Sequence, residues 1–250
     1  MGLKFHMKAF KNNNDEQGIS PENALDNEGE AFITKYINAI KSITGECPDI
    51  SIITVWNESD NITWGDTYKE YANSLITQLQ ELYPNTLIGG STHAEDYLQY
   101  KSNNVEIVDF FGCNLYSGVP YDVPTYLQCC ESLGKIMKDY DGQLNSTSIK
   151  ERLGHLCERT NKKYLITEVG VAPYETSARS PGDYVVTGKT KNNEVQINYL
   201  RANYNFYVRD PNCMGICLFT IGGTIENIEW FKDDELYNNV KDMFGGVDND

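Results

Sequence analysis

The sequence lacks any run of about eighteen apolar residues, so no membrane-spanning helix is predicted. Its first residues also lack the apolar core of a signal peptide. Localisation therefore stays open. A complete chain would be cytoplasmic, whereas a chain with an incomplete N-terminus could be secreted, a reading that the Asn-x-Ser/Thr sites at Asn57, Asn61 and Asn145 weakly favour.

Basic residues are scarce relative to acidic ones: 21 Lys and Arg stand against 36 Asp and Glu, for a net charge of −15. Nucleic acids and anionic membranes are polyanions, so neither is an expected partner. A neutral ligand such as a carbohydrate is compatible with this charge, and the 17 tyrosines offer aromatic faces suited to sugars. The composition does not predict an oligomeric state.

Metal-ligand spacing is missing as well. The seven cysteines form neither a C-x-x-C pair nor a cluster with histidine, and their number is odd. Neither a zinc site nor a disulfide framework is predicted, and no cofactor is expected. Cys113 and Cys217 lie within apolar strand-like runs, where we expect them to be buried.

The apolar patterns predict strands that alternate with helices. The expected strands cover residues 3–10, 51–56, 86–90, 105–116, 164–168 and 214–221. The expected helices cover residues 28–43, 67–83, 121–140, 149–160, 194–207 and 233–244, with long loops at 11–28 and 172–191. In the helix at 67–83, one apolar face is expected to hold Tyr71, Leu75, Leu79 and Leu82.

This alternation predicts an α/β fold with a parallel sheet. At 250 residues the chain has about the size of one (β/α)8 TIM barrel, but only six βα units are visible. The first two units are therefore irregular or absent, and we favour a chain that begins at the third strand. We expect residues 1–250 to form a single barrel domain that is incomplete at its N-terminus.

Two of the predicted strands lead directly into a carboxylate. Glu58 ends the stretch Val55-Trp56-Asn57-Glu58, and Glu168 lies in Thr167-Glu168-Val169-Gly170. Ligands of parallel α/β folds are handled at the carboxyl ends of the strands. We therefore expect Glu58 and Glu168 to face one substrate, although a glutamate just past a strand is by itself more often a solvated loop residue.

A third motif, the run DFFGCNLY from Asp109 to Tyr116, completes a recognisable set. Together the three motifs resemble the large clan of retaining glycoside hydrolases, clan A, in which strand four carries the acid/base and strand seven the nucleophile. Taking residues 51–56 as strand four makes residues 164–168 strand seven, so the order agrees. The DFFGCNLY run is similar to that of β-1,3-glucanosyltransferases and related bacterial hydrolases, and the resemblance covers about residues 50–221.

The resemblance implies a retaining hydrolase of a β-linked poly- or oligosaccharide. Glu58 would be the acid/base and Glu168 the nucleophile, with their carboxyl groups about 5–5.5 Å apart. Asn57 would bind the sugar 2-hydroxyl, and Tyr116 would hold the nucleophile. His93 would orient Glu58 or bind a sugar hydroxyl, unless it is a structural histidine. The further substrate-binding residues implied are Asn114 and Trp230.

Departures from the pattern leave alternatives open. Trp56 and Val169 stand where glucanosyltransferases carry a glycine and an aromatic residue, and Phe219 to Gly223 lacks the tryptophan common at the end of strand eight. The sugar platform would then be missing or supplied by Trp230, although Trp230 could equally cap a core. The alternatives are a β-glucan transglycosylase and a non-catalytic carbohydrate-binding relic of such a barrel.

Overall fold

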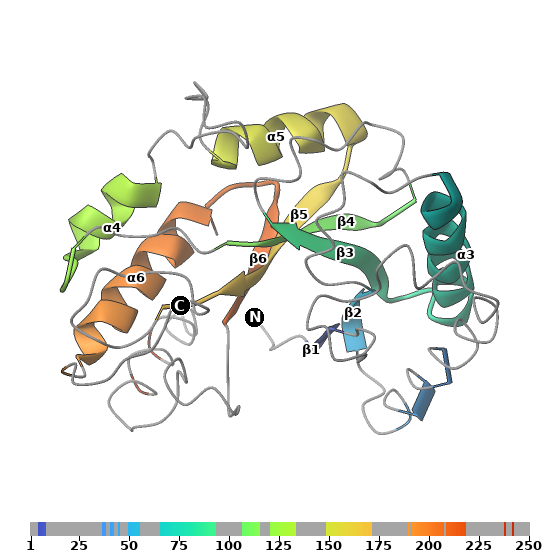
Figure 1. Ribbon diagram of the computed structural model, residues 1–250, viewed down its shortest axis with the longest axis horizontal. Helices are drawn as coiled ribbons and strands as arrows, with labels where there is room; N and C mark the ends of the chain where they lie inside the picture. Colours follow the sequence, from blue (N-terminus) through green and yellow to red (C-terminus); the bar gives the residue numbers. More distant parts are fainter. Residues whose placement is uncertain are drawn as a thin grey trace, which may run out of the picture. The chain divides into compact units, whose positions relative to one another are not determined.

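The computed structural model describes part of the chain (Figure 1). The described residues are 5–8, 37–38, 41–42, 45, 50–55, 66–93, 107–115, 121–133, 149–171, 190, 192–207, 209–218, 238 and 242. Contacts divide the chain into two compact units. The N-terminal unit comprises Gly2–Cys113 and Leu156–Tyr164, and the C-terminal unit comprises Met1, Asn114–His155 and Leu165–Asp250.

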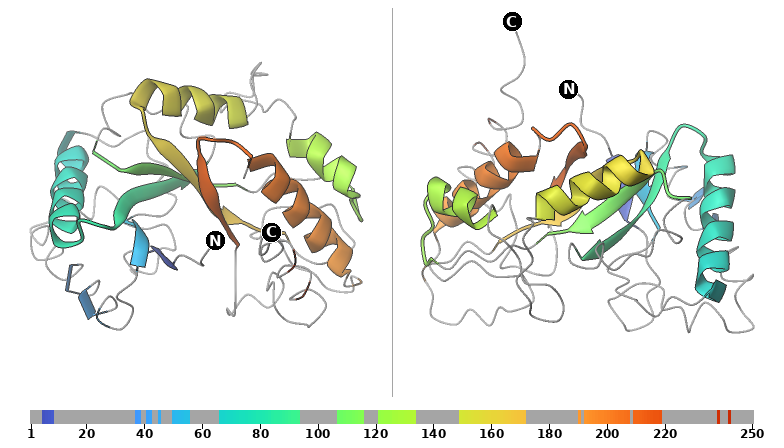
Figure 2. Two further views of the ribbon diagram at one scale, coloured as in Figure 1. Left: turned by 180° about the vertical axis from the view of Figure 1, so that it is seen from behind. Right: turned by 90° about the horizontal axis from the view of Figure 1, so that it is seen from above.

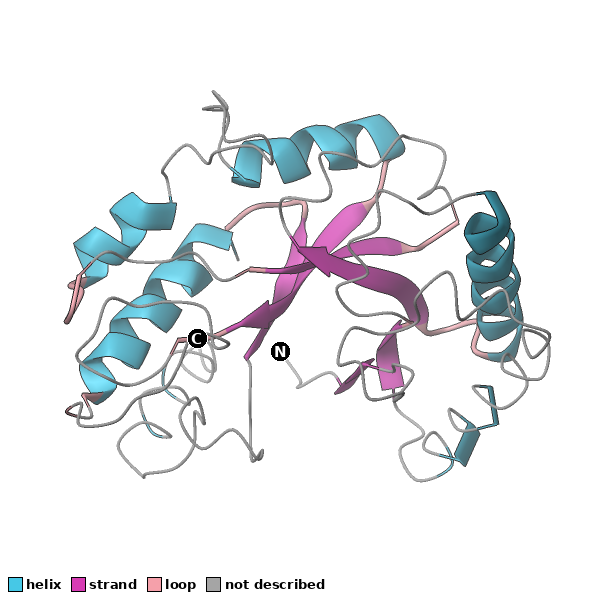
Figure 3. Cartoon of the chain, viewed as in Figure 1, coloured by secondary structure: helices cyan, strands magenta, loops and turns pink. Residues whose placement is uncertain are grey.

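The described strands, magenta in Figure 3, are hydrogen-bonded to one another in the order in which they occur along the chain. They are β1 (Phe5–Lys8), β2 (Ile50–Thr54), β3 (Leu87–His93), β4 (Phe110–Asn114), β5 (Lys163–Val169) and β6 (Cys213–Leu218). β2 pairs in parallel with both β1 and β3, and Ile53 lies opposite Met7 on one side and Ile88 on the other. The expected α/β class with a parallel sheet is confirmed. A closed eight-stranded barrel and a single domain over residues 1–250 stay predictions.

In the N-terminal unit, β3 packs against the preceding helix, α3 (Asp66–Leu82), and pairs with β2. Ile53 and Ile88 are fully buried, and the buried face of the described part of α3 is formed by Leu75, Ile76 and Leu79. Leu82 is 42% exposed, so the prediction that it belongs to the buried apolar face of this helix is wrong. The reason is position: Leu82 is the last residue of α3, where the chain turns toward Pro84.

β3 and β4 approach each other closely at Gly89. A Cβ atom added to Gly89 would lie 2.6 Å from Cζ of the Phe110 ring and 2.7 Å from the Phe110 carbonyl oxygen. Only glycine leaves room for this contact. The expected strand at 86–90 therefore exists and continues to His93, whereas β4 is shorter than the expected strand at 105–116.

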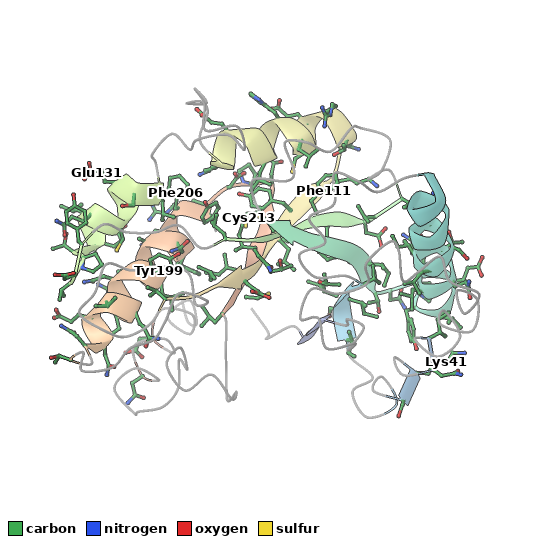
Figure 4. The ribbon with its side chains drawn as sticks, viewed as in Figure 1. Lys41, Phe111, Glu131, Tyr199, Phe206 and Cys213 are labelled. Atoms are coloured by element: carbon green, nitrogen blue, oxygen red, sulfur yellow. The ribbon has the colours of Figure 1, made fainter. Side chains whose placement is uncertain are left out.

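In the C-terminal unit, α4 (Tyr126–Leu133) lies beside α6 (Asn193–Tyr207), as both views in Figure 2 show. Asn198 Nδ2 donates to the Pro124 carbonyl at 3.1 Å, and Asn205 Nδ2 donates to the Tyr126 hydroxyl at 3.3 Å. The side chains on α6, with Tyr199 and Phe206 labelled, are drawn in Figure 4. Tyr199 is buried, so α6 contributes to the core of this unit.

The start of α4 corrects the expected helix at 121–140. Residues 121–123 form bends, and the helix begins only after Thr125. The Thr125 hydroxyl accepts a hydrogen bond from Gln128 N–H at 3.3 Å, and Gln128 Oε1 accepts one from Thr125 N–H at 2.9 Å. This reciprocal pair is a capping box, which starts a helix. Residues 134–140 lie outside the described part of the chain.

The remaining elements agree with the sequence to varying degrees. α5 (Ile149–Thr160) has the bounds that its periodicity predicts, and β5 and α6 extend their predictions by one or two residues. All six residues of β6 are half-buried, so the expected burial of Cys217 is wrong, whereas Cys113 is fully buried. β6 is last in the strand order of the described residues, and such a strand has a neighbour on one side only. The expected helices at 28–43 and 233–244 lie almost entirely outside the described residues.

Candidate active site

Buried polar residues lie at the carboxyl ends of β4 and β5. Asn114 is the last residue of β4. Thr167 and Glu168 directly precede Val169, the last residue of β5. Their exposed fractions are 2%, 3% and 6%. Polar side chains are costly to bury unless they are hydrogen-bonded, so these residues are expected to have partners.

Hydrogen bonds hold these strand ends together. The Thr167 hydroxyl donates to Asn114 Oδ1 at 2.7 Å, and both side chains are buried. The backbone N–H of Leu115 donates to the carbonyl oxygen of Glu168 at 2.9 Å. Glu168 therefore lies between two connections from β5 to the end of β4.

Glu168 is a carboxylic acid that is almost fully buried. Taking an ionised carboxylate out of water costs free energy, and a protein keeps such a group where it is paired or where it has chemical work to do. Among candidate roles for a carboxylate at the carboxyl end of a parallel strand are nucleophile, general base and hydrogen-bond acceptor for a ligand.

The chain just after Glu168 is fixed by a residue that no sequence motif singles out. Gln196 is fully buried in the first turn of α6, and its Nε2 donates to the Val171 carbonyl oxygen at 2.9 Å. Its Oε1 has no hydrogen-bond partner among the described residues. A polar residue between Val195 and Ile197, within a helix whose buried face is otherwise largely apolar, is the signal that the sequence does offer.

The other predicted site residues fall outside what the structure describes. Asn57, Glu58, Tyr116 and Trp230 lie outside the described residues, and His93 is described only as the backbone end of β3. The pairing of Glu58 with Glu168 stays a prediction. The described residues that lead to Glu58, Thr54 and Val55, are fully buried, and the N–H of Val55 donates to the Gly89 carbonyl at 2.8 Å.

The described residues offer neither a metal centre nor a membrane span. No group of three or more His, Cys, Asp or Glu side chains in that part of the chain could hold a metal ion. No described helix is both long enough and apolar enough to cross a membrane. The six described cysteines are present as thiols, and Cys47 lies outside the described residues.

No protein-family model matches the sequence, and no curated protein matches it either. Solved structures do match. A GH113 β-1,4-mannanase shares 14% identity, with a TM-score of 0.54, over 92% of this chain and 66% of its own. A GH113 β-mannanase from Alicyclobacillus acidocaldarius shares 12% identity, with a TM-score of 0.53, over 80% and 56%. A GH2 β-galacturonidase from Eisenbergiella tayi shares 16% identity, with a TM-score of 0.53, over 91% and 38%.

At identities this low the likeness shows the fold alone. The chain spans between 38% and 66% of the length of these three structures. All three are glycoside hydrolases, and such neighbours are TIM-barrel hydrolases. The chain therefore shares an α/β fold with part of each of these structures.

Proposed function

We propose that this protein is a retaining glycoside hydrolase that cleaves a β-linked poly- or oligosaccharide, with Glu168 as nucleophile and Glu58 as acid/base. One observation carries the proposal: Glu168 is a buried carboxylate at the carboxyl end of a parallel strand, in a fold shared with glycoside hydrolases. The motif order along the chain supports the same assignment.

The reaction runs in two displacements. Glu168 attacks the anomeric carbon while Glu58 protonates the departing glycosidic oxygen, which gives a covalent glycosyl ester. Glu58 then takes a proton from water, which attacks the same carbon and releases Glu168. The burial of Glu168 suits the first step, because a carboxylate shielded from water is a stronger nucleophile and its ester is protected from premature hydrolysis.

The remaining residues take supporting roles in the proposal. Asn57 binds the sugar 2-hydroxyl, a contact that strengthens in the transition state. Tyr116 holds the nucleophile and His93 orients Glu58. Asn114 borders the sugar from the end of β4, and Trp230 supplies the aromatic platform.

Covalent trapping tests the proposal. The protein is incubated with a panel of 2-deoxy-2-fluoro β-glycosyl fluorides in the gluco, manno and galacto series. Intact-mass measurement detects a covalent label, and peptide mapping then locates it. The fluorine slows hydrolysis of the intermediate, so one glycosyl group is expected on Glu168. Glu168→Gln should abolish labelling. Glu194→Gln, which changes an exposed glutamate in the first turn of α6, should leave labelling intact.

An unchanged mass across the whole panel would sink the proposal. Binding of oligosaccharide with no turnover and no label would identify a carbohydrate-binding relic instead. Redistribution of chain lengths without net release of reducing ends would identify a transglycosylase, which uses the same covalent intermediate.

A further inference from the structure

Thr167 lies directly before Glu168, and its side chain has no part in the reaction just described. It is 3% exposed, and its hydroxyl donates to Asn114 Oδ1 at 2.7 Å. This bond joins β5 to β4 through side chains, whereas parallel strands are otherwise joined through their backbones. The bond is thus an additional connection between the two strands, directly before Glu168.

The chemistry of threonine suits this place. A β-branched side chain has few χ1 rotamers, so its hydroxyl loses little conformational freedom when it is held in a hydrogen bond. The partner Asn114 is 2% exposed, and a hydrogen bond between two buried side chains is little weakened by water. One residue further along, the Glu168 carbonyl accepts the Leu115 N–H at 2.9 Å. The backbone of Glu168 is therefore flanked on both sides by connections to β4.

We infer that Thr167 is a positioning residue: its hydrogen bond to Asn114 sets the place of the Glu168 carboxylate relative to the sugar. The inference rests on the proposed function, because it assigns Thr167 a role through the nucleophile. Nucleophilic attack needs reacting atoms about 3–3.5 Å apart, and a displacement of about 1 Å can cost about a hundredfold in rate. Loss of the hydroxyl should therefore lower the rate of attack more than it weakens sugar binding.

Two substitutions separate the hydroxyl from the shape of the side chain. Thr167→Val keeps the branched shape and removes the donor, whereas Thr167→Ser keeps the donor. We expect Thr167→Val to slow the labelling of Glu168 about ten- to a hundredfold, with KM for an aryl glycoside changed less than about threefold. Thr167→Ser should restore most of the rate. If Thr167→Val does not fold, Thr167→Ala provides the same comparison with a smaller side chain.

Thr86→Val is the matched control. The Thr86 hydroxyl also makes an internal hydrogen bond, to the Ile50 carbonyl at 2.9 Å, but it lies in the N-terminal unit at the start of β3. Loss of the Thr86 hydrogen bond should lower the thermal stability about as much as Thr167→Val does, but it should leave the rate of Glu168 labelling unchanged. Equal slowing by Thr86→Val and Thr167→Val would overturn the inference, as would a Thr167→Ser variant as slow as Thr167→Val.

A second measurement does not depend on glycosidase activity. Hydrogen exchange of the Leu115 amide reports the bond from Leu115 N–H to the Glu168 carbonyl. It should become about tenfold faster in Thr167→Val and stay unchanged in Thr167→Ser. If no glycoside labels the wild-type protein, the proposed function fails, and the exchange rate then tests only whether the Thr167 side chain fixes the backbone at Glu168. An unchanged rate in Thr167→Val would then overturn the positioning role as well.

Discussion

Ile88 and Asp109 exchange two hydrogen bonds. The N–H of Ile88 donates to Asp109 Oδ2 at 2.8 Å, and the N–H of Asp109 donates to the Ile88 carbonyl at 2.8 Å. Gln80 of α3 adds a third bond, from its Nε2 to Asp109 Oδ1 at 3.1 Å. One carboxylate thus joins α3, β3 and the start of β4. Asp109 opens the DFFGCNLY run and Asn114 lies near its end, so one motif supplies both a structural anchor and a strand-end residue.

Replacing Asp109 with asparagine should destabilise the protein. An amide has one oxygen where the carboxylate has two, so either Ile88 N–H or Gln80 Nε2 would face an NH2 group. The site is part-buried, and Gln80 Nε2 also donates to the Ile107 carbonyl at 3.2 Å, so the expected loss is about 1 kcal/mol in the free energy of unfolding. Urea denaturation should show this loss for Asp109→Asn. Asp122→Asn changes an exposed aspartate and should leave the midpoint unchanged; equal midpoints for the two variants would refute the anchoring role.

Two glycine-to-alanine substitutions should change stability in opposite directions. A methyl group at Gly89 would overlap the Phe110 ring and carbonyl, so Gly89→Ala should cost about 1–3 kcal/mol. Gly154 lies within α5, and a methyl group there would meet no neighbouring atom within 4 Å, so Gly154→Ala should gain about 1 kcal/mol. Thermal melts of both variants test this, and the same sign of change in both would contradict it.

The sequence predicts best where local chemistry decides structure. α5 has the bounds that its periodicity predicts, because its apolar spacing and polar flanks are local signals. α4 begins later than its apolar pattern predicts because the capping box of Thr125 and Gln128, not the apolar spacing, sets its first turn. The bond from Thr167 to Asn114 joins residues 53 positions apart, and no local pattern predicts such a partner. The acid/base half of the site, around Glu58, stays a prediction.

Gln196 should tolerate an apolar substitute better than a charged one. Gln196→Met loses the bond to the Val171 carbonyl but also removes the unpartnered Oε1, for a net cost of about 1 kcal/mol. Gln196→Glu places a carboxylate against that carbonyl in a fully buried position. A buried carboxyl group has a raised pKa. The loss of stability in Gln196→Glu should therefore exceed that in Gln196→Met at pH 7, and part of the lost stability should return at pH 5. Unfolding midpoints at both pH values measure this, and a Met variant less stable than the Glu variant at pH 7 would refute it.

Cys129 should make the protein less stable in alkali. Burial, helped by the neighbouring Cys130, raises the pKa of the Cys129 thiol from 9.0 to about 12. Between these values the unfolded chain loses the proton while the folded chain keeps it, so the free energy of unfolding falls as pH rises. Cys129→Ala should weaken this fall between pH 8 and pH 10.5 in urea titrations. Parallel pH dependences for the variant and the wild type would show that Cys129 does not contribute.

The contact between Gly89 and Phe110 also provides a spectroscopic reporter. The hydrogen that replaces a side chain on Gly89 points at the Phe110 ring, and aromatic ring currents displace the resonance of any proton held so close. That single proton should therefore resonate away from its position in an unstructured peptide only while β3 and β4 are paired. Following it during refolding would time the pairing of these strands independently of any activity.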